Sequence, residues 1–225
     1  MALLTQQIRS PLGIDSFAEA RHEMVEKQIR RRGVTDGGVL EAMERVERHR
    51  FVPPDHRRLA YEDSALPIGL GQSISQPYMV AAMTQALELQ PGSRVLEIGS
   101  GSGYQTAVLA ELADRVYSVE RIAQLSYDAR AVLASLNYTN VDFRIGDGSK
   151  GWPEEAPFDG IIVTAAAANV PPALLDQLGE GASLVIPVGG PPDQDLYQIR
   201  REGDTFLKHF ITRCRFVPLI EEEGD

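Results

Sequence analysis

The chain has 225 residues, 43% of them hydrophobic and 24% charged, so it can bury its own core as one domain with an extension. Its net charge of −10 opposes general nucleic-acid binding, which needs a basic face, and the basic clusters at 30–32 and 57–58 are typical of solvated helix faces. The single cysteine, Cys214, excludes an intrachain disulfide and fits a reducing compartment. The start of the chain lacks a secretory-signal pattern, and the longest apolar stretch, 160–168, is too short to span a bilayer, so we expect a cytoplasmic protein without a membrane segment.

The first ninety residues are expected to form a helical extension with a loop segment. Ser16 and Glu19 have the spacing of a capping box, and Gly33 is a good C-terminal helix cap. Residues 55–77 are rich in Gly, Pro and Ser, which predicts irregular structure. Helices are predicted over 17–32, 35–48 (opened by Thr35) and 79–89.

From Arg94 onward short apolar runs alternate with helical segments, which predicts a parallel sheet covered on both faces. Two final strands, 196–201 and 206–216, are joined by a turn at 202–204 and form a hairpin that breaks this alternation. We therefore expect residues 91–225 to form an α/β core on which residues 1–90 pack, as one structural domain overall. The other strands are predicted near 94–99, 115–119, 141–145, 158–163 and 182–187, and helices near 104–113, 122–136 and 171–179.

Residues 94–103, Arg-Val-Leu-Glu-Ile-Gly-Ser-Gly-Ser-Gly, are the most informative segment. They predict a strand, a glycine turn and a helix start, the arrangement that holds a nucleotide-like ligand at a helix N-terminus. Glu120 ends the next apolar run, 21 positions after Gly99, where a carboxylate can accept hydrogen bonds from both ribose hydroxyls. Tyr104 stands where a dinucleotide fingerprint needs its third glycine, which counts against a nicotinamide oxidoreductase.

The Gly-x-Gly-x-Gly form resembles the first motif of S-adenosylmethionine-dependent methyltransferases. That resemblance implies S-adenosyl-L-methionine as cofactor and a doubly wound, mostly parallel seven-stranded sheet with an antiparallel C-terminal hairpin. Ligands of such sheets lie beyond the carboxyl ends of the strands, so the loops there form the candidate site. Asp147 either reads the adenine edge or is simply a turn aspartate, and small residues from Thr164 onward either leave room for substrate or allow close helix packing. The expected cofactor-binding residues are Gly99, Ser100, Gly101, Ser102, Gly103, Glu120, Arg121, Gly146, Asp147, Gly148 and Thr164.

The loop Tyr61–Pro77, Tyr-Glu-Asp-Ser-Ala-Leu-Pro-Ile-Gly-Leu-Gly-Gln-Ser-Ile-Ser-Gln-Pro, resembles the signature of the protein-L-isoaspartate (D-aspartate) O-methyltransferase family. The resemblance continues through the cofactor motifs to Arg-Phe-Val-Pro-Leu at 215–219 and covers roughly residues 20–220. It implies a repair enzyme that methylates the free α-carboxylate of L-isoaspartyl and D-aspartyl residues, giving an ester that reverts through succinimide. The implied partners are isoaspartyl-containing proteins and peptides, with no nucleic acid, no membrane and no metal, and we expect a monomer.

The same resemblance makes Ser75 the active-site serine that holds the substrate carboxylate, whereas the alternative is a cap for the helix near Met79. No general base is needed, because an α-carboxylate that titrates near ~3.5 is already ionised at neutral pH. None of the four histidines falls in a predicted site loop. The expected substrate-binding residues, besides Ser75, are Leu66, Pro67, Ile68, Gly69, Ile74, Ala165, Ala166, Val217 and Leu219.

Three other functions compete with this interpretation. The first is an S-adenosylmethionine-dependent methyltransferase acting on another substrate, such as RNA or a small molecule, which would not need the loop at 61–77. The second is a nicotinamide oxidoreductase, against which Tyr104 counts. The third is a non-catalytic binding protein that keeps the fold. The intact set of Gly99–Gly103, Glu120, Asp147 and Ser75 counts against a protein without activity.

Overall fold

The computed structural model describes residues 14–190 and 193–220. In this part of the chain no helix has the length and apolar character needed to cross a membrane. The helices are α1 (Ile14–Glu23), α2 (Gly37–Arg45), α3 (Pro77–Gln85), α4 (Tyr104–Ala110), α5 (Ala123–Ser135) and α6 (Pro172–Asp176). The strands are β1 (Leu66–Gly69), β2 (Gln72–Ile74), β3 (Arg94–Ile98), β4 (Arg115–Glu120), β5 (Val141–Ile145), β6 (Phe158–Val163), β7 (Leu178–Val188), β8 (Gln194–Glu202) and β9 (Thr205–Cys214).

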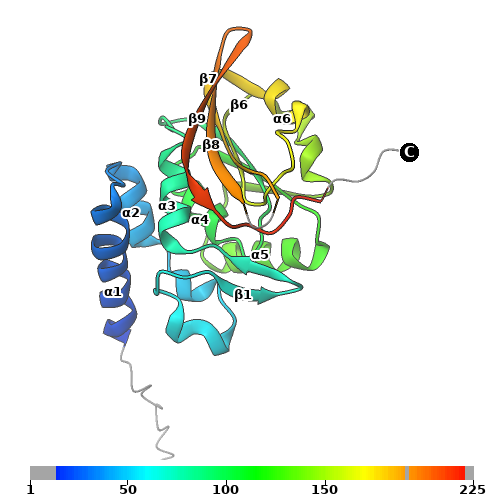
Figure 1. Ribbon diagram of the computed structural model, residues 1–225. Helices are drawn as coiled ribbons and strands as arrows, with labels where there is room; N and C mark the ends of the chain where they lie inside the picture. The colour runs from blue at the N-terminus through cyan, green and yellow to red at the C-terminus, as the bar shows by residue number, and fades with distance from the viewer. Residues whose placement is uncertain (1–13, 191–192, 221–225) are drawn as a thin grey trace, which may run out of the picture.

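Seven strands form the central sheet in the order β5-β4-β3-β6-β7-β8-β9 (Figure 1). The first five strands in this order, β5, β4, β3, β6 and β7, are parallel to one another. β8 and β9 then follow as antiparallel strands. The expected α/β fold with a mostly parallel seven-stranded sheet and a C-terminal hairpin is confirmed. The order reverses at β3, which pairs with both β4 and β6, so the carboxyl ends of β3 and β6 mark the switch point where ligands bind in such sheets.

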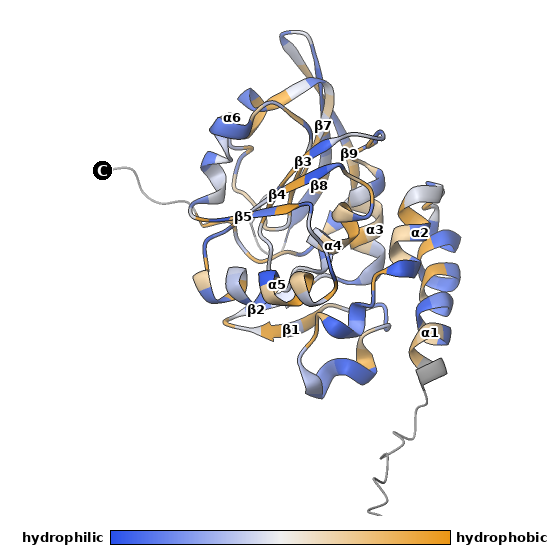
Figure 2. Cartoon of the chain, turned by 180° about the vertical axis from the view of Figure 1, so that it is seen from behind, coloured by the Kyte–Doolittle hydropathy of each residue, from blue (hydrophilic) through white to orange (hydrophobic). Residues whose placement is uncertain are grey.

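Both faces of the sheet are covered, as continuous apolar strands require. Val95 points to the face on which α3 and α4 pack, whereas Leu96 and Ile98 point to the opposite face and share a core with Leu174 of α6. Figure 2 shows hydrophilic and hydrophobic residues alternating along α1 and α2. The sheet is therefore a rigid support for the loops at its carboxyl edge.

The helix starts predicted in the N-terminal part are wrong by two to three residues. α1 begins at Ile14, so Ser16 lies inside the helix and is not its N-cap. A π-helical turn and a 3-10 turn continue α1 to Arg32, and Gly33 ends this run in the left-handed conformation, with φ of 96°, as predicted. α2 is capped by Asp36, not opened by Thr35, because the Asp36 carboxylate accepts a hydrogen bond of 2.8 Å from the Val39 amide.

Residues 55–77 are more ordered than predicted. A 3-10 helix, Pro54–Leu59, is followed by the β1–β2 hairpin, in which Leu66 faces Ile74. Gly69, Leu70 and Gly71 all have positive φ and turn the chain sharply between the two strands. The glycines that suggested a loop thus form the turn of a hairpin.

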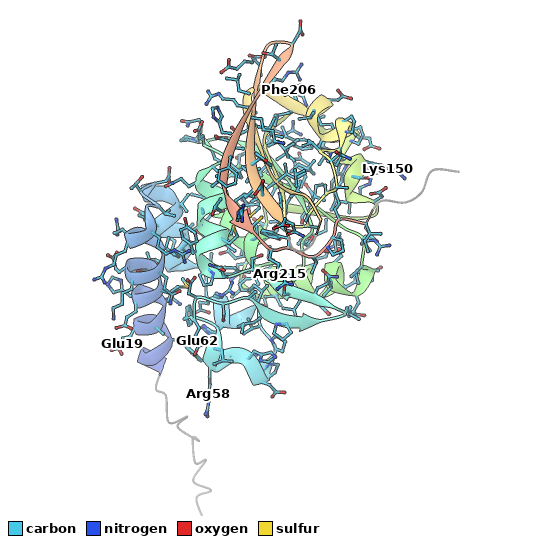
Figure 3. All side chains as sticks on the ribbon, viewed as in Figure 1. Glu19, Arg58, Glu62, Lys150, Phe206 and Arg215 are labelled. Atoms are coloured by element: carbon cyan, nitrogen blue, oxygen red, sulfur yellow. The ribbon has the colours of Figure 1, made fainter. Side chains whose placement is uncertain are left out.

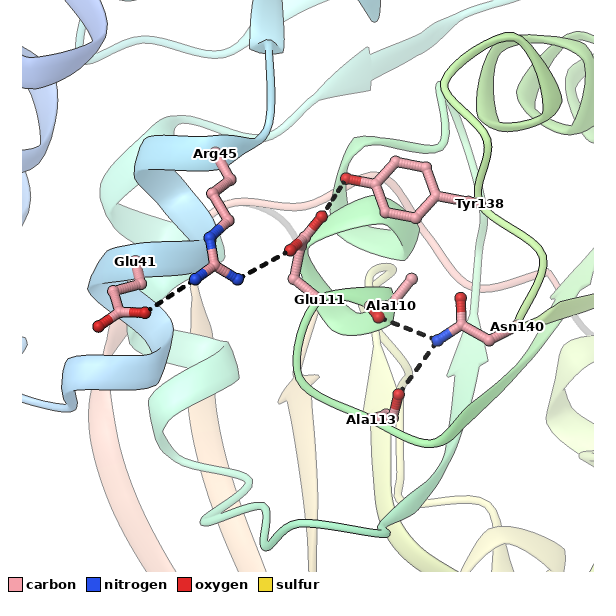
Figure 4. A network of polar contacts seen from close by, with 7 residues as sticks. All are labelled: Glu41, Arg45, Ala110, Glu111, Ala113, Tyr138 and Asn140. Carbon is pink, nitrogen blue, oxygen red and sulfur yellow. Dashed lines mark hydrogen bonds and ion pairs between the residues drawn. The ribbon is translucent and has the colours of Figure 1, made fainter.

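The N-terminal segment shares a core with the α/β part of the chain. Met24, Ile29 and Met43 are fully buried in one cluster with Tyr104 of α4 and Leu133 of α5. A polar network (Figure 4) adds to this contact: Arg45 of α2 lies 3.1 Å from Glu41 and 3.4 Å from Glu111, and Glu111 accepts a hydrogen bond of 2.7 Å from the Tyr138 hydroxyl. The division of the chain at residue 90 stays a prediction, because nothing here tests it.

Candidate active site

The glycine loop after β3 takes a conformation that only glycine tolerates at two of its positions. Gly99 has φ of 96°, and a Cβ there would collide with the hydroxyl of Thr164, which lies 2.8 Å from the Gly99 carbonyl oxygen. Gly103 has φ of 87° and precedes α4, where a Cβ would lie 2.7 Å from the Leu133 side chain. The loop therefore packs tightly against β6 on one side and α5 on the other.

Glu120 links this loop to the end of β4. Its carboxylate accepts hydrogen bonds from the backbone amides of Gly101, at 3.0 Å, and Ile122, at 2.9 Å. The residue is 6% exposed, yet it lines an open hollow at the switch point. A carboxylate has about four lone-pair directions, so Glu120 keeps acceptor capacity for a ligand in that hollow.

We call this open hollow beside Glu120, at the carboxyl ends of β3 and β4, the cofactor hollow. Of the predicted residues it is lined by Gly99, Gly101, Glu120, Arg121, Gly148, Thr164, Ala165, Val217 and Leu219. It is also lined by residues that the sequence did not single out, namely Gln72, Ser73, Ile98, Val119, Ile122, Pro218 and Ile220. Ile98 is the last residue of β3, and Val119 is the last but one of β4. This position at the carboxyl ends of neighbouring strands could have identified both as site residues from the sequence.

Asp147 follows β5 but does not line the cofactor hollow. Its carboxylate accepts hydrogen bonds from the Ser149 amide, at 2.9 Å, and from the Ser149 hydroxyl, at 2.7 Å, and Lys150 Nζ lies 3.5 Å away. Asp147 therefore caps the short 3-10 turn Gly148–Lys150, and its contact with adenine stays a prediction, as does a contact by Gly146.

A chain of buried polar side chains lies beneath the glycine loop. The Ser100 and Ser118 hydroxyls are 2.6 Å apart, and Ser118 and Thr106 donate hydrogen bonds to Glu97 at 2.5 and 2.6 Å. Burial raises the pKa of the Glu97 carboxyl to about 7. Ser100 and Ser102 also line a small pocket that reaches Ser75.

A second concavity, the substrate cleft, adjoins the cofactor hollow. The two share Ser73, Thr164 and Val217, so these residues form the boundary between them. The cleft is lined by Arg32, Ala65, Ser73, Ser75, Gln76, Tyr78, Met79, Thr164, Thr212, Arg213, Cys214, Arg215, Phe216 and Val217. In Figure 3, Arg215 lies between the end of β9 and the β1–β2 hairpin.

Three arginines line the cleft, and two of them make it basic although the whole chain is acidic. The Arg32 guanidinium pairs with Asp63 at 2.6 Å and lies 3.5 Å from the centre of the Tyr78 ring. Arg213 and Arg215 are exposed and pair with no carboxylate of the described residues. The cleft therefore favours an anionic ligand.

Ser75 stands where the cleft meets the cofactor side. It is half-buried, lines both the cleft and the small pocket beside Ser100 and Ser102, and its hydroxyl has no hydrogen-bond partner among the described residues. The capping alternative for Ser75 is wrong, because Gln76 is the N-cap of α3 and Pro77 its first residue. The hydroxyl is thus free to bind a ligand.

The other predicted substrate residues have different surroundings. Leu66 and Ile74 are 6% and 4% exposed and belong to the core beneath the hairpin, with Ile74 also lining the small pocket. Ile68 is half-buried, while Pro67 and Gly69 are exposed. Ala166 holds the C-terminal segment in place, since its amide donates to the Val217 carbonyl at 2.8 Å and its carbonyl accepts from the Leu219 amide at 2.7 Å.

Other reactive groups are inert or remote. Burial raises the pKa of the Cys214 thiol to about 11, so it is protonated at neutral pH. No histidine lines the hollow or the cleft, and no group of three metal-ligating side chains occurs, within residues 14–190 and 193–220.

The comparisons agree with this geometry. The family model for protein-L-isoaspartate(D-aspartate) O-methyltransferase matches residues 19–224. A protein-L-isoaspartate O-methyltransferase from Syntrophus aciditrophicus is 53% identical, over 94% of this chain and 98% of that protein, and one from Opitutus terrae is 55% identical, over 90% and 88%.

Two solved structures have the same fold. One, a protein-L-isoaspartate O-methyltransferase, has a TM-score of 0.79 at 28% identity and covers 88% of this chain and 65% of that chain. The other, a protein-L-isoaspartate O-methyltransferase (beta-aspartate methyltransferase) from Plasmodium falciparum in complex with S-adenosyl-L-homocysteine, has a TM-score of 0.77 at 26% identity and covers 92% and 99%. Fold and site together define an S-adenosylmethionine-dependent methyltransferase. The chain belongs to the protein-L-isoaspartate(D-aspartate) O-methyltransferase family.

Proposed function

We propose that this chain transfers a methyl group from S-adenosyl-L-methionine to the free α-carboxylate of L-isoaspartyl and D-aspartyl residues in damaged proteins and peptides, with Ser75 as the residue that orients this carboxylate. Family membership makes the chain a protein-repair methyltransferase of the carboxyl O-methylating class. The methyl ester re-forms a succinimide, and part of that hydrolyses to normal aspartate. The observation that carries the site assignment is the unpartnered Ser75 hydroxyl where a basic cleft adjoins the cofactor hollow.

The residues around the hollow fit S-adenosyl-L-methionine. Glu120 is pre-oriented by two backbone amides and keeps lone pairs for a ribose diol. Ile98, Val119 and Ile122 supply apolar surface for an adenine ring. When bound, the cofactor supplies an electrophilic methyl group on a sulfonium.

The protein contributes orientation and water exclusion to an in-line displacement. The α-carboxylate is ionised at neutral pH, since such groups titrate near ~3.5, so the reaction needs no general base. The Ser75 hydroxyl donates to one carboxylate oxygen and thereby aims the other toward the cofactor hollow. Arg213 and Arg215 attract the anionic peptide, and the segment pinned by Ala166 covers the hollow.

The activity is tested with methyl-labelled S-adenosyl-L-methionine and two peptides that differ only in isoaspartate against aspartate. We expect label in the isoaspartyl peptide and essentially none in its aspartyl twin. Equal labelling of both peptides, or of neither, would overturn the assignment. Label in a small molecule or in RNA, with neither peptide labelled, would instead support the alternative of a methyltransferase with another substrate.

The proposal includes a cytoplasmic monomer that binds no nucleic acid. The lone cysteine, which cannot form an intrachain disulfide, supports a reducing compartment. The net charge of −10 supports the absence of nucleic-acid partners. Sedimentation equilibrium gives the oligomeric state, and a mass of twice 24.7 kDa would contradict the monomer.

A further inference from the structure

Arg48 is a fully buried cation that no part of the chemistry above uses. It is 0% exposed, and no carboxylate of the described residues pairs with it. Its Nη1 atom is buried without a hydrogen-bond partner, and burial lowers the pKa of its guanidinium to about 10. Burying a charge without an opposite charge costs folding free energy. The contacts of Arg48 should therefore show which role offsets this cost.

Those contacts join the two ends of the loop that carries Ser75. Arg48 Nε donates to the Ala60 carbonyl oxygen at 2.7 Å, and Nη2 donates to the Ser75 carbonyl oxygen at 2.8 Å. The residues between, 61–74, include the β1–β2 hairpin. Ser75 itself lies in the joint between β2 and α3, outside both elements, so the regular hydrogen bonds of a strand or helix do not hold it in place.

The guanidinium also contacts the cofactor side of the site. Its carbon lies 4.7 Å from the centre of the Tyr104 ring, and Tyr104 is the first residue of α4, directly after the glycine loop. The Tyr104 ring is further held by Phe51, at 5.6 Å between ring centres. One side chain thus connects the Ser75 backbone with α4, the helix that follows the glycine loop.

We propose that Arg48 is a positioning residue for Ser75, which sets the place of the Ser75 hydroxyl relative to the glycine loop. This inference rests on the proposed role of Ser75 in methyl transfer. The planar guanidinium suits the task, because it donates in two fixed directions and stacks on an aromatic ring at the same time, which a lysine ammonium cannot do.

The test compares Arg48→Met, which keeps length and removes every donor, with Arg48→Lys, which keeps the charge and can reach one carbonyl. We expect Arg48→Met to lower kcat for an isoaspartyl peptide on the order of 10-fold to 10²-fold, because small misplacements of a reacting group have effects of this size. The dissociation constant of S-adenosylhomocysteine should stay within about twofold in both variants, and Arg48→Lys should recover part of kcat. Leu174→Ala, a buried change in α6 on the far face of the sheet, is the control for lost stability and should melt earlier with kcat kept.

A double-mutant cycle separates positioning from a merely structural role. If Arg48 acts through Ser75, the loss in kcat caused by changing Arg48 should largely vanish in a Ser75→Ala background. The cycle is run with Arg48→Lys as well, so that it does not depend on the folding of the methionine variant. Additive losses, or a variant that melts early and turns over normally, would overturn the proposal. A wild-type chain that does not methylate the isoaspartyl peptide would instead refute the proposed function.

Discussion

The cofactor hollow and the substrate cleft adjoin each other but are built in different ways. The hollow is formed mainly by short loops that directly follow parallel strands, such as Gly99 after β3, Glu120 at the end of β4 and Thr164 after β6. The cleft gathers Arg32 from the N-terminal segment, Ser75 from the joint before α3, and Arg215 from beyond β9. The residues that line the hollow can thus be recognised from the local sequence around each strand end. The lining of the cleft, by contrast, depends on how distant segments of the chain pack together.

The two regions also differ in charge. Glu120 brings a carboxylate to the hollow, while the cleft holds three arginines, of which Arg32 is neutralised by Asp63. A chain with a net charge of −10 therefore presents positive charge at the place where an anionic peptide is proposed to bind. The acidic remainder of the surface repels such a peptide elsewhere.

The largest expected effect concerns Glu97, beneath the hollow. Its folded-state pKa of about 7 lies above the ordinary value of 4.5, so the folded state binds more protons between these values and stability falls as pH rises through this window. At 1.36 kcal/mol per pKa unit the loss is on the order of 3 kcal/mol. Urea unfolding at pH 5 and pH 8 should therefore show a smaller pH-dependent loss for Glu97→Gln than for wild type. An identical loss in both proteins would place the titrating group elsewhere.

The next effect tests the substrate side through Ser75. Ser75→Ala should lower turnover of an isoaspartyl peptide about 10²-fold, because the substrate carboxylate loses its orientation. Affinity for S-adenosylhomocysteine and the melting temperature should stay near the wild-type values. The matched control is Ser135→Ala, at an exposed position in α5, which should leave turnover unchanged. A melting temperature that falls while turnover is kept would assign Ser75 a structural role.

On the cofactor side, Glu120→Ala should weaken binding of S-adenosylhomocysteine by about 1.5–3 kcal/mol, the value of hydrogen bonds to a charged group. Calorimetry measures this loss, and Glu88→Ala, which removes an exposed carboxylate paired with Arg200, should leave affinity unchanged. An unchanged dissociation constant in the folded Glu120 variant would mean that the ribose is bound elsewhere. Together with the Ser75 variant, this change shows whether the two regions can be impaired separately.

The smallest effect tests the charge of the cleft. Arg215→Ala should raise KM for an isoaspartyl peptide by at most about fivefold, since single exposed charges contribute up to roughly 1 kcal/mol. The effect should shrink in high salt, because salt screens exposed charges. Arg58→Ala removes the same charge at a place far from Arg215 (Figure 3) and should leave KM unchanged. Equal effects of both substitutions would show that the net charge of the chain matters and the cleft does not.

The sequence determined most of the sheet and the position of the glycine turn between β3 and α4. Most of the parallel strands contain a short apolar run between breaks, and such runs can be recognised without tertiary information. The glycines at 99–103 could be predicted from the backbone geometry that a strand-turn-helix unit needs, and Glu120 from its place at the end of the next strand. Helix starts were less accurate, because Asp36 and Thr35 are both good caps and local preference does not decide between them.

Only the tertiary structure decided how the substrate side is assembled. The hairpin at 66–74 packs Leu66 and Ile74 into the N-terminal core, a contact between segments distant in the chain. The meeting of Arg32, Ser75 and Arg215 joins residues that are far apart in the chain, and no local pattern encodes such contacts. Arg48 is the clearest case, because an arginine in sequence suggests a solvated charge, and only the fold reveals that it is buried against the backbone of Ser75.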